Sequence, residues 1–140
     1  MFYSKEEAPY KYVINVDLPG LLESGHEGIF KIIMTSHANL TVHEFTESVK
    51  NWLKESRHPK FNIEYNRMTY LPMIELIDYL KANEFKVFIV SGGGVDFMRA
   101  WAPEAYGIPS EQIIGSSMKS KLITRDSSME IMKLPVLDFF

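Results

Sequence analysis

The sequence predicts an α/β fold from the order of its patterns. Up to about residue 68 the chain carries helical periodicity alone, and after that it alternates helix, strand, helix, strand. Such alternation is typical of proteins in which helices flank parallel strands. The run KVFIVS (86–91) is apolar on both faces, which is the pattern of a parallel strand covered on both sides. We therefore expect a helical region over 1–68 and an α/β region over 69–140.

Three segments are expected to be helices before the first strand. Residues 26–38 carry isoleucines at helical spacing. In the segment 41–56, Thr41 and Glu44 have the spacing of a capping box, in which each side chain satisfies a backbone N–H of the other residue. Apolar residues then form one stripe along that segment. A third helix is expected over 70–85, with a proline in its first turn.

The second half is expected to hold two parallel strands and a hairpin. The strand 86–91 leads into a helix over 95–107 that ends at a glycine, and a second short strand follows at 112–117. Residues 120–134 have the pattern of a hairpin turned at RDSS (125–128).

Composition excludes several functional classes. The 140 residues carry a formal net charge of -3, which does not favour general nucleic-acid binding. No apolar run reaches the roughly 18 residues of a membrane span. There is no cysteine, so disulfides and thiolate metal sites are excluded. The N-terminal residues have no apolar signal-peptide core, and a cytoplasmic location is expected.

The stretch SGGG (91–94) joins the strand 86–91 to the helix after it, and it allows two interpretations. A glycine-rich turn lets the backbone approach an anion closely, so Ser91 and the N–H groups of Gly92 and Gly93 are candidate phosphate ligands. Alternatively, the glycines serve only a tight turn. The stretch lacks the G-x-G-x-x-G dinucleotide pattern and the G-K-[ST] ending of a P-loop.

Residues 70–117, from YLPMIEL through SGGGVDF to QIIGSS, resemble the core of haloacid dehalogenase (HAD) superfamily phosphatases, in the branch related to phosphoserine phosphatase. Residues 17–61 resemble the helical cap of that branch. The resemblance implies a partial HAD-type, Rossmann-like core of parallel strands with flanking helices, plus a helical cap. It also implies that the Ser91 hydroxyl binds the phosphoryl group.

Other features of that family are missing from the sequence. The resemblance implies a nucleophilic aspartate in a D-x-D-G-[TV] motif and Mg²⁺ held by that motif and by a later G-D-x-x-x-D, and neither pattern occurs. Asp17, after an apolar strand-like run, is the nearest match to the nucleophile, but Pro19 occupies the acid/base position. The lysine of the third motif is expected beyond Phe140. We therefore expect no catalytic residue and no metal ligand in this chain, which resembles a truncated gene product, a split gene or an expressed fragment.

These observations lead to a functional expectation. The chain is expected to be part of a magnesium-dependent phosphomonoester hydrolase, inactive by itself, that acts on a small phosphorylated metabolite. The alternatives are a phosphate-binding module without chemistry and an interaction module. Because the neighbouring strand of a HAD sheet is missing, the strand 86–91 is also expected to expose an edge through which the chain can self-associate.

Overall fold

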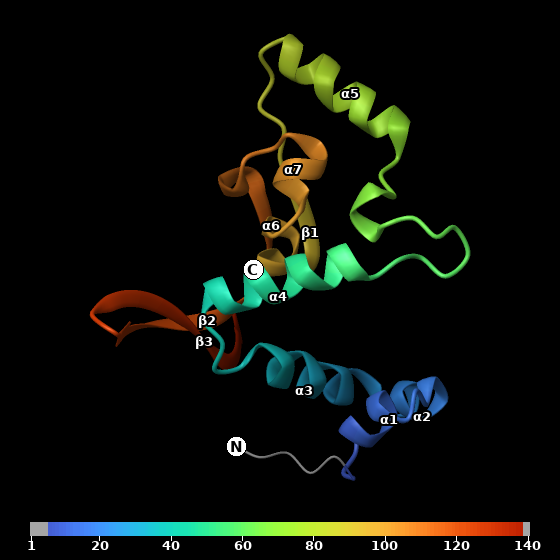
Figure 1. The fold of residues 1–140 in the computed structure, drawn as a ribbon, viewed down its shortest axis with the longest axis vertical. Helices are drawn as coiled ribbons and strands as arrows, with labels where there is room; N and C mark the ends of the chain where they lie inside the picture. The colour runs from blue at the N-terminus through green and yellow to red at the C-terminus, as the bar shows by residue number, and fades with distance from the viewer. Residues whose placement is uncertain (1–5, 139–140) are drawn as a thin grey trace.

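A computed structural model of the chain describes residues 6–138. Figure 1 shows its elements in space. In chain order they are α1 (Tyr10–Ile14), α2 (Leu18–Glu23), α3 (Gly25–His37), α4 (Val42–Glu55), a 3-10 turn (Tyr65–Arg67), α5 (Leu71–Ala82), β1 (Ile89–Gly94), α6 (Val95–Arg99), α7 (Ala102–Tyr106), a second 3-10 turn (Ser110–Gln112), β2 (Ile113–Arg125) and β3 (Ser128–Asp138).

The strands form one three-stranded sheet in the order β1-β2-β3. β1 pairs with β2 in parallel, from Ile89 opposite Ile113 to Ser91 opposite Gly115. β2 and β3 are antiparallel. A mixed α/β fold is thus confirmed, with a single parallel pair of strands.

The expected hairpin is confirmed, although β2 is longer than predicted. β2 runs unbroken through both the predicted strand 112–117 and the first arm of the hairpin. The turn residues Asp126 and Ser127 have φ values of 48° and 67°. Two positive values in succession match the right-handed twist of a tight hairpin, and short polar residues tolerate that conformation.

The three helices predicted before the first strand are confirmed in their positions as α3, α4 and α5. A capping box explains where α4 begins. The Thr41 N–H donates to Glu44 Oε2 at 2.7 Å, and the Glu44 N–H donates to Thr41 Oγ1 at 3.1 Å. This is the capping box that the sequence predicts. Phe45, Val49 and Leu53 then form the buried stripe of the helix.

The single helix predicted over 95–107 is wrong, because two short helices occupy that segment. α6 ends at Arg99 and α7 begins at Ala102, with Trp101 between them at φ -140°. Pro103 explains the break, since a proline has no N–H to donate and its ring crowds the carbonyl four residues earlier, that of Arg99.

The prediction that the first strand is covered on both faces is also wrong. β1 begins at Ile89 and continues into the glycines. Phe88 and Val90 are 50% and 74% exposed on one face. β1 is an outer strand of the sheet, so one of its edges has no strand beside it among residues 6–138.

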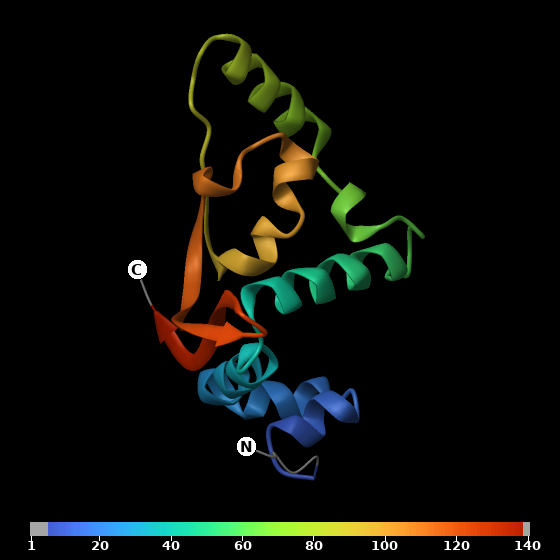
Figure 2. The same cartoon turned by 60° about the vertical axis from the view of Figure 1, so that its left-hand side comes forward.

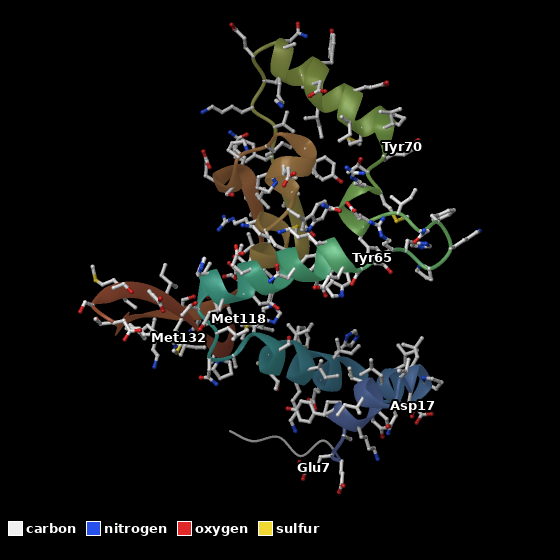
Figure 3. The ribbon with its side chains drawn as sticks, viewed as in Figure 1. Glu7, Asp17, Tyr65, Tyr70, Met118 and Met132 are labelled. Carbon is white, nitrogen blue, oxygen red and sulfur yellow. The ribbon has the colours of Figure 1, made fainter. Side chains whose placement is uncertain are left out.

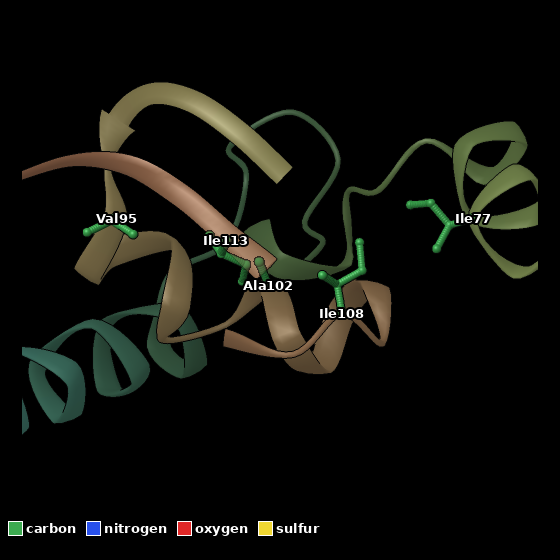
Figure 4. Close-up of a cluster of buried hydrophobic side chains, with 5 residues drawn as sticks. All are labelled: Ile77, Val95, Ala102, Ile108 and Ile113. Carbon is green, nitrogen blue, oxygen red and sulfur yellow. The ribbon is translucent and has the colours of Figure 1, made fainter. Parts of the chain in front are cut away.

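Two small clusters form the core. The larger lies between β1, β2, α6 and α7 and comprises Ile77, Val95, Ala102, Ile108 and Ile113 (Figure 4). Ile77 reaches it from α5, which stands apart at the top of Figures 1 and 2. The smaller cluster is the buried stripe of α4, and Trp101 packs against both clusters.

The hairpin packs against two helices of the first half. β3 contacts α3 and α4, and α4 also contacts α6, which follows β1 (Figure 2). Within residues 6–138, the chain forms no helix with the length and apolar content that a membrane span requires.

Candidate functional site

Residues 91–94, predicted as a turn after the strand and called the glycine turn below, are instead the last four residues of β1, with a shift in their register to β2 between Ser91 and Gly94. The glycine turn forms part of the wall of two pockets. The narrow pocket, of about 200 Å³, lies between the turn, α3 and the two hairpin strands. The wide pocket, of about 510 Å³, lies between the turn, α3, α4 and α6. Ile33, His37, Gly93 and Gly94 line both pockets, so the two spaces adjoin along the turn. The structure therefore brings the three sequence-predicted ligands, Ser91, Gly92 and Gly93, beneath α3 and α4.

Two hydroxyl groups anchor the turn. The Gly93 N–H donates to Ser91 Oγ at 3.0 Å. From β2, the Ser116 hydroxyl donates to the Gly92 carbonyl at 3.0 Å. An anion that arrives at the Gly93 N–H must therefore share or replace the bond to Ser91.

Neither backbone conformation nor packing requires glycine at positions 92 and 94. Within residues 6–138 the glycines with positive φ are Gly25 and Gly107. A Cβ atom added to Gly92 or Gly94 would meet nothing within 4 Å. The effect of these two glycines is to leave bare backbone at the surface of the turn. This weighs against the interpretation that the glycines serve only a tight turn.

At Gly115, on the neighbouring strand β2, packing does require glycine. A Cβ atom there would lie 2.7 Å from the Gly93 carbonyl oxygen and 2.6 Å from Met98 Cε. Glycine at this position lets β2 approach the turn closely. No local sequence pattern marks Gly115, because its close neighbours come from other elements.

A buried ion pair lies next to the turn. Lys133 Nζ on β3 is 2.6 Å from Asp96 Oδ2 on α6, and the two side chains are 6% and 13% exposed. Asp96 also lines the narrow pocket. Within residues 6–138, Asp96 is the one Asp or Glu on the wall of either pocket, and the lysine neutralises its charge. Lys133 was not expected to lie here, because no local pattern reveals a pairing across 37 residues.

Arg99 binds the backbone around the start of β2. Its guanidinium donates from Nε to the Ser110 carbonyl at 3.0 Å and from Nη2 to the Ile113 carbonyl at 2.9 Å. These bonds connect α6 to the start of β2.

Asp17 lies away from the turn and has a local role. Its side chain accepts the Gly20 N–H at 3.0 Å and so caps α2. The run before it, expected to be strand-like, is helix α1. In Figure 3 Asp17 lies with α1 and α2, far from Met118, which lines the narrow pocket. The structure does not bring Asp17 to the candidate phosphate ligands.

The residues present do not fit a magnesium site. Mg²⁺ is held through carboxylate oxygens together with water or phosphate. Residues 6–138 contain no group of three or more Asp, Glu, His or Cys side chains that could hold a metal. The carboxylate nearest the turn, Asp96, is already paired with Lys133. No chemical step through a metal follows from this arrangement.

Comparison with known proteins adds no assignment, since no family model matches the chain and no curated protein matches it.

Proposed function

We propose that the chain binds the phosphate group of a small phosphorylated metabolite at the glycine turn, and that it is the cap and phosphate-binding part of a HAD-like phosphomonoester hydrolase. The ligands are the Ser91 hydroxyl and the backbone N–H groups of Gly92 and Gly93. The observation that carries the proposal is the bare backbone of the turn, where two glycines that neither φ nor packing requires face two pockets.

The surroundings of the turn support a weak site for a phosphate. Ser91 supplies a neutral hydroxyl, and the Asp96 charge that would repel an anion is neutralised by Lys133. α6 has five residues, so its dipole adds little to the attraction. Backbone and hydroxyl donors without a cation favour affinity in the millimolar range, about 4 kcal/mol.

The order of elements supports the HAD-like assignment. The parallel strand β1 carries Ser91 followed by three glycines and leads directly into helix α6, and the helices α3 and α4 lie over the glycine end of the strand. The sequence resemblance over residues 17–61 and 70–117 has the same order, cap first and serine strand second.

The first test is catalytic. The chain has no D-x-D-G motif, and Asp17 lies away from the turn, so we expect no Mg²⁺-dependent hydrolysis of p-nitrophenyl phosphate above background. A hydrolase needs roughly 8 kcal/mol or more of barrier lowering, which the turn by itself cannot supply. Robust Mg²⁺-dependent turnover by the pure 140-residue chain would contradict this expectation.

The second test is binding. Titration with inorganic phosphate should shift the NMR signals of the backbone amides of residues 91–95. Ser91→Ala should weaken that response, because it removes the hydroxyl. Ser128→Ala is the matched control, since the Ser128 hydroxyl donates to the Arg125 carbonyl at 2.8 Å at the hairpin turn and Ser128 lines neither pocket. If phosphate shifts none of the amides at 91–95, the proposed site is refuted.

A phosphate-binding module without chemistry is the second candidate. It is favoured by the ion pair between Lys133 and Asp96, which engages the carboxylate nearest the turn. Phosphate binding combined with absent hydrolysis fits either candidate. Recovery of hydrolysis when a polypeptide with a D-x-D-G motif and a G-D-x-x-x-D motif is added would select the hydrolase.

A further inference from the structure

The chemistry of the wide pocket points to the kind of molecule that carries the phosphate. Its wall is formed mainly by apolar side chains from α3, α4 and α6, together with backbone of the turn. Three of these apolar side chains stay partly exposed: Ile33 at 38%, Trp52 at 47% and Phe97 at 37%. The Trp52 and Phe97 rings are 6.4 Å apart, inclined at 55°. Binding of an apolar group here is favourable, because it removes these apolar side chains from water.

Charged groups are absent from this pocket. Among residues 6–138, no Lys, Arg, Asp or Glu lines it. The titratable side chain that the structure describes on its wall is that of His37, whose Nδ1 lies 2.7 Å from the Ile33 carbonyl oxygen and 2.9 Å from the Ser36 hydroxyl. An ammonium or carboxylate group of a ligand would lose water here without meeting an opposite charge, which is unfavourable.

We propose that the wide pocket holds an uncharged, apolar or aromatic ester group, so that the ligand of this chain is an apolar phosphomonoester and not a phosphorylated amino acid. This inference rests on the proposed function, because it places the phosphate at the glycine turn. The wide pocket lies within the usual range of ligand sites, about 300–1,000 Å³, and a phenyl-sized group fits it. Ser91, Gly93 and Gly94 border the pocket, so one small molecule can contact both the turn and the aromatic side chains.

The experiment compares three ligands on the intact chain by NMR: inorganic phosphate, phenyl phosphate and O-phosphoserine. We expect phenyl phosphate to bind at least tenfold more tightly than inorganic phosphate, with shifts at the amides of residues 91–95 and at the Trp52 indole. O-phosphoserine should bind no more tightly than inorganic phosphate.

Variants separate the two parts of the site. Trp52→Ala should abolish the tenfold advantage of phenyl phosphate over inorganic phosphate, with the ratio of the two affinities measured in the same variant. Phe61→Ala is the matched control, because Phe61 is 53% exposed and lines neither pocket. This control should keep the full advantage.

The outcomes distinguish failure of this inference from failure of the proposed function. If inorganic phosphate shifts residues 91–95 but phenyl phosphate binds no more tightly, or O-phosphoserine binds more tightly, the apolar ester group is refuted and the phosphate site stands. If Trp52→Ala still binds phenyl phosphate tenfold more tightly than inorganic phosphate, the phenyl group does not bind in the wide pocket and the inference is also refuted. If no ligand shifts residues 91–95, the phosphate site and this inference both fail.

Discussion

Glu44 and Arg125 join the tip of the hairpin to the start of α4. Arg125 Nη1 donates to Glu44 Oε1 at 2.8 Å, while the other carboxylate oxygen accepts the Thr41 N–H. The Thr41 N–H, and after it the Arg125 guanidinium, holds the pKa of Glu44 below its ordinary value of 4.5. The same carboxylate raises the pKa of Arg125. One ionised side chain therefore caps a helix and binds a strand 81 residues away.

The first residue-scale prediction concerns acid stability. The pKa of Glu44 is lower in the folded chain than in the unfolded chain. Its contribution to the free energy of unfolding is therefore present above about pH 4.5 and is lost as the pH falls through the folded pKa. The melting temperature of the wild-type chain should therefore fall as the pH is lowered from 7 to 3. In Glu44→Gln this fall should be smaller. Glu75→Gln changes an exposed carboxylate on α5 and is the control. If the melting temperature of Glu44→Gln falls as much at low pH as that of the wild type, Glu44 does not stabilise the fold as proposed.

The ion pair between Lys133 and Asp96 connects two elements, β3 and α6, beside the glycine turn. Both side chains are almost fully buried, so each charge depends on the other for compensation. The backbone of the same strand segment also pairs with the chain before α4: the Lys133 N–H donates to the Leu40 carbonyl and the Asn39 N–H donates to the Lys133 carbonyl. β3 is thus held to both the first half of the chain and α6.

The element-scale prediction concerns the free energy of unfolding of a single and a double variant of this ion pair. Lys133→Met leaves the Asp96 carboxylate buried without a partner, which costs about 3–5 kcal/mol of unfolding free energy. Adding Asp96→Asn removes that charge and should recover part of the loss. Lys119→Met, an exposed lysine of β2, should change stability by less than about 0.5 kcal/mol. Denaturant unfolding measures all three, and a neutral Lys133→Met variant would refute the importance of the pair.

The whole molecule exposes more surface to solvent than a compact monomer of the same mass. Its accessible surface is 10254 Å², whereas a compact monomer of 16.2 kDa exposes about 7,500 Å². Phe85, Phe88 and Val90, at and just before β1, are each at least half exposed. The α5 side chains Leu71 and Tyr79 are 65% and 66% exposed. The unpaired edge of β1 and these apolar side chains together form a surface suited to another chain.

The whole-molecule prediction is self-association through the edge of β1. Light scattering over a concentration series should show a mass that rises with concentration, because pairing at the edge satisfies backbone N–H and C=O groups and covers apolar surface. Val90→Lys should shift the equilibrium towards monomer.

Met129→Lys is the matched control for this prediction, since Met129 on the hairpin is 75% exposed, close to the 74% of Val90. It should leave the association unchanged. A monodisperse wild-type monomer with a high melting temperature would contradict the importance of the exposed edge.

At the scale of residues and single elements, the sequence alone determined much of this protein. The capping box of Thr41 and Glu44, the stripe of α4 and the hairpin turn were predictable because each depends on residues a few positions apart. The split between α6 and α7 is also local, and Pro103 was the signal that could have revealed it. The position of Ser91 in a parallel strand followed from the apolar run before it, although the strand continues past Ser91 to Gly94.

Only the tertiary structure decided what surrounds the glycine turn. The pairing of Lys133 with Asp96, the close approach of Gly115 and the cover by α3 and α4 join residues far apart in the chain, and no local pattern specifies them. The exposed face of β1 was missed for the same reason, because an apolar run shows what a strand can bury but not whether a neighbour is present to cover it. Burial and charge compensation depend on the packing of distant segments, whereas capping, periodicity and turn geometry arise within a few residues.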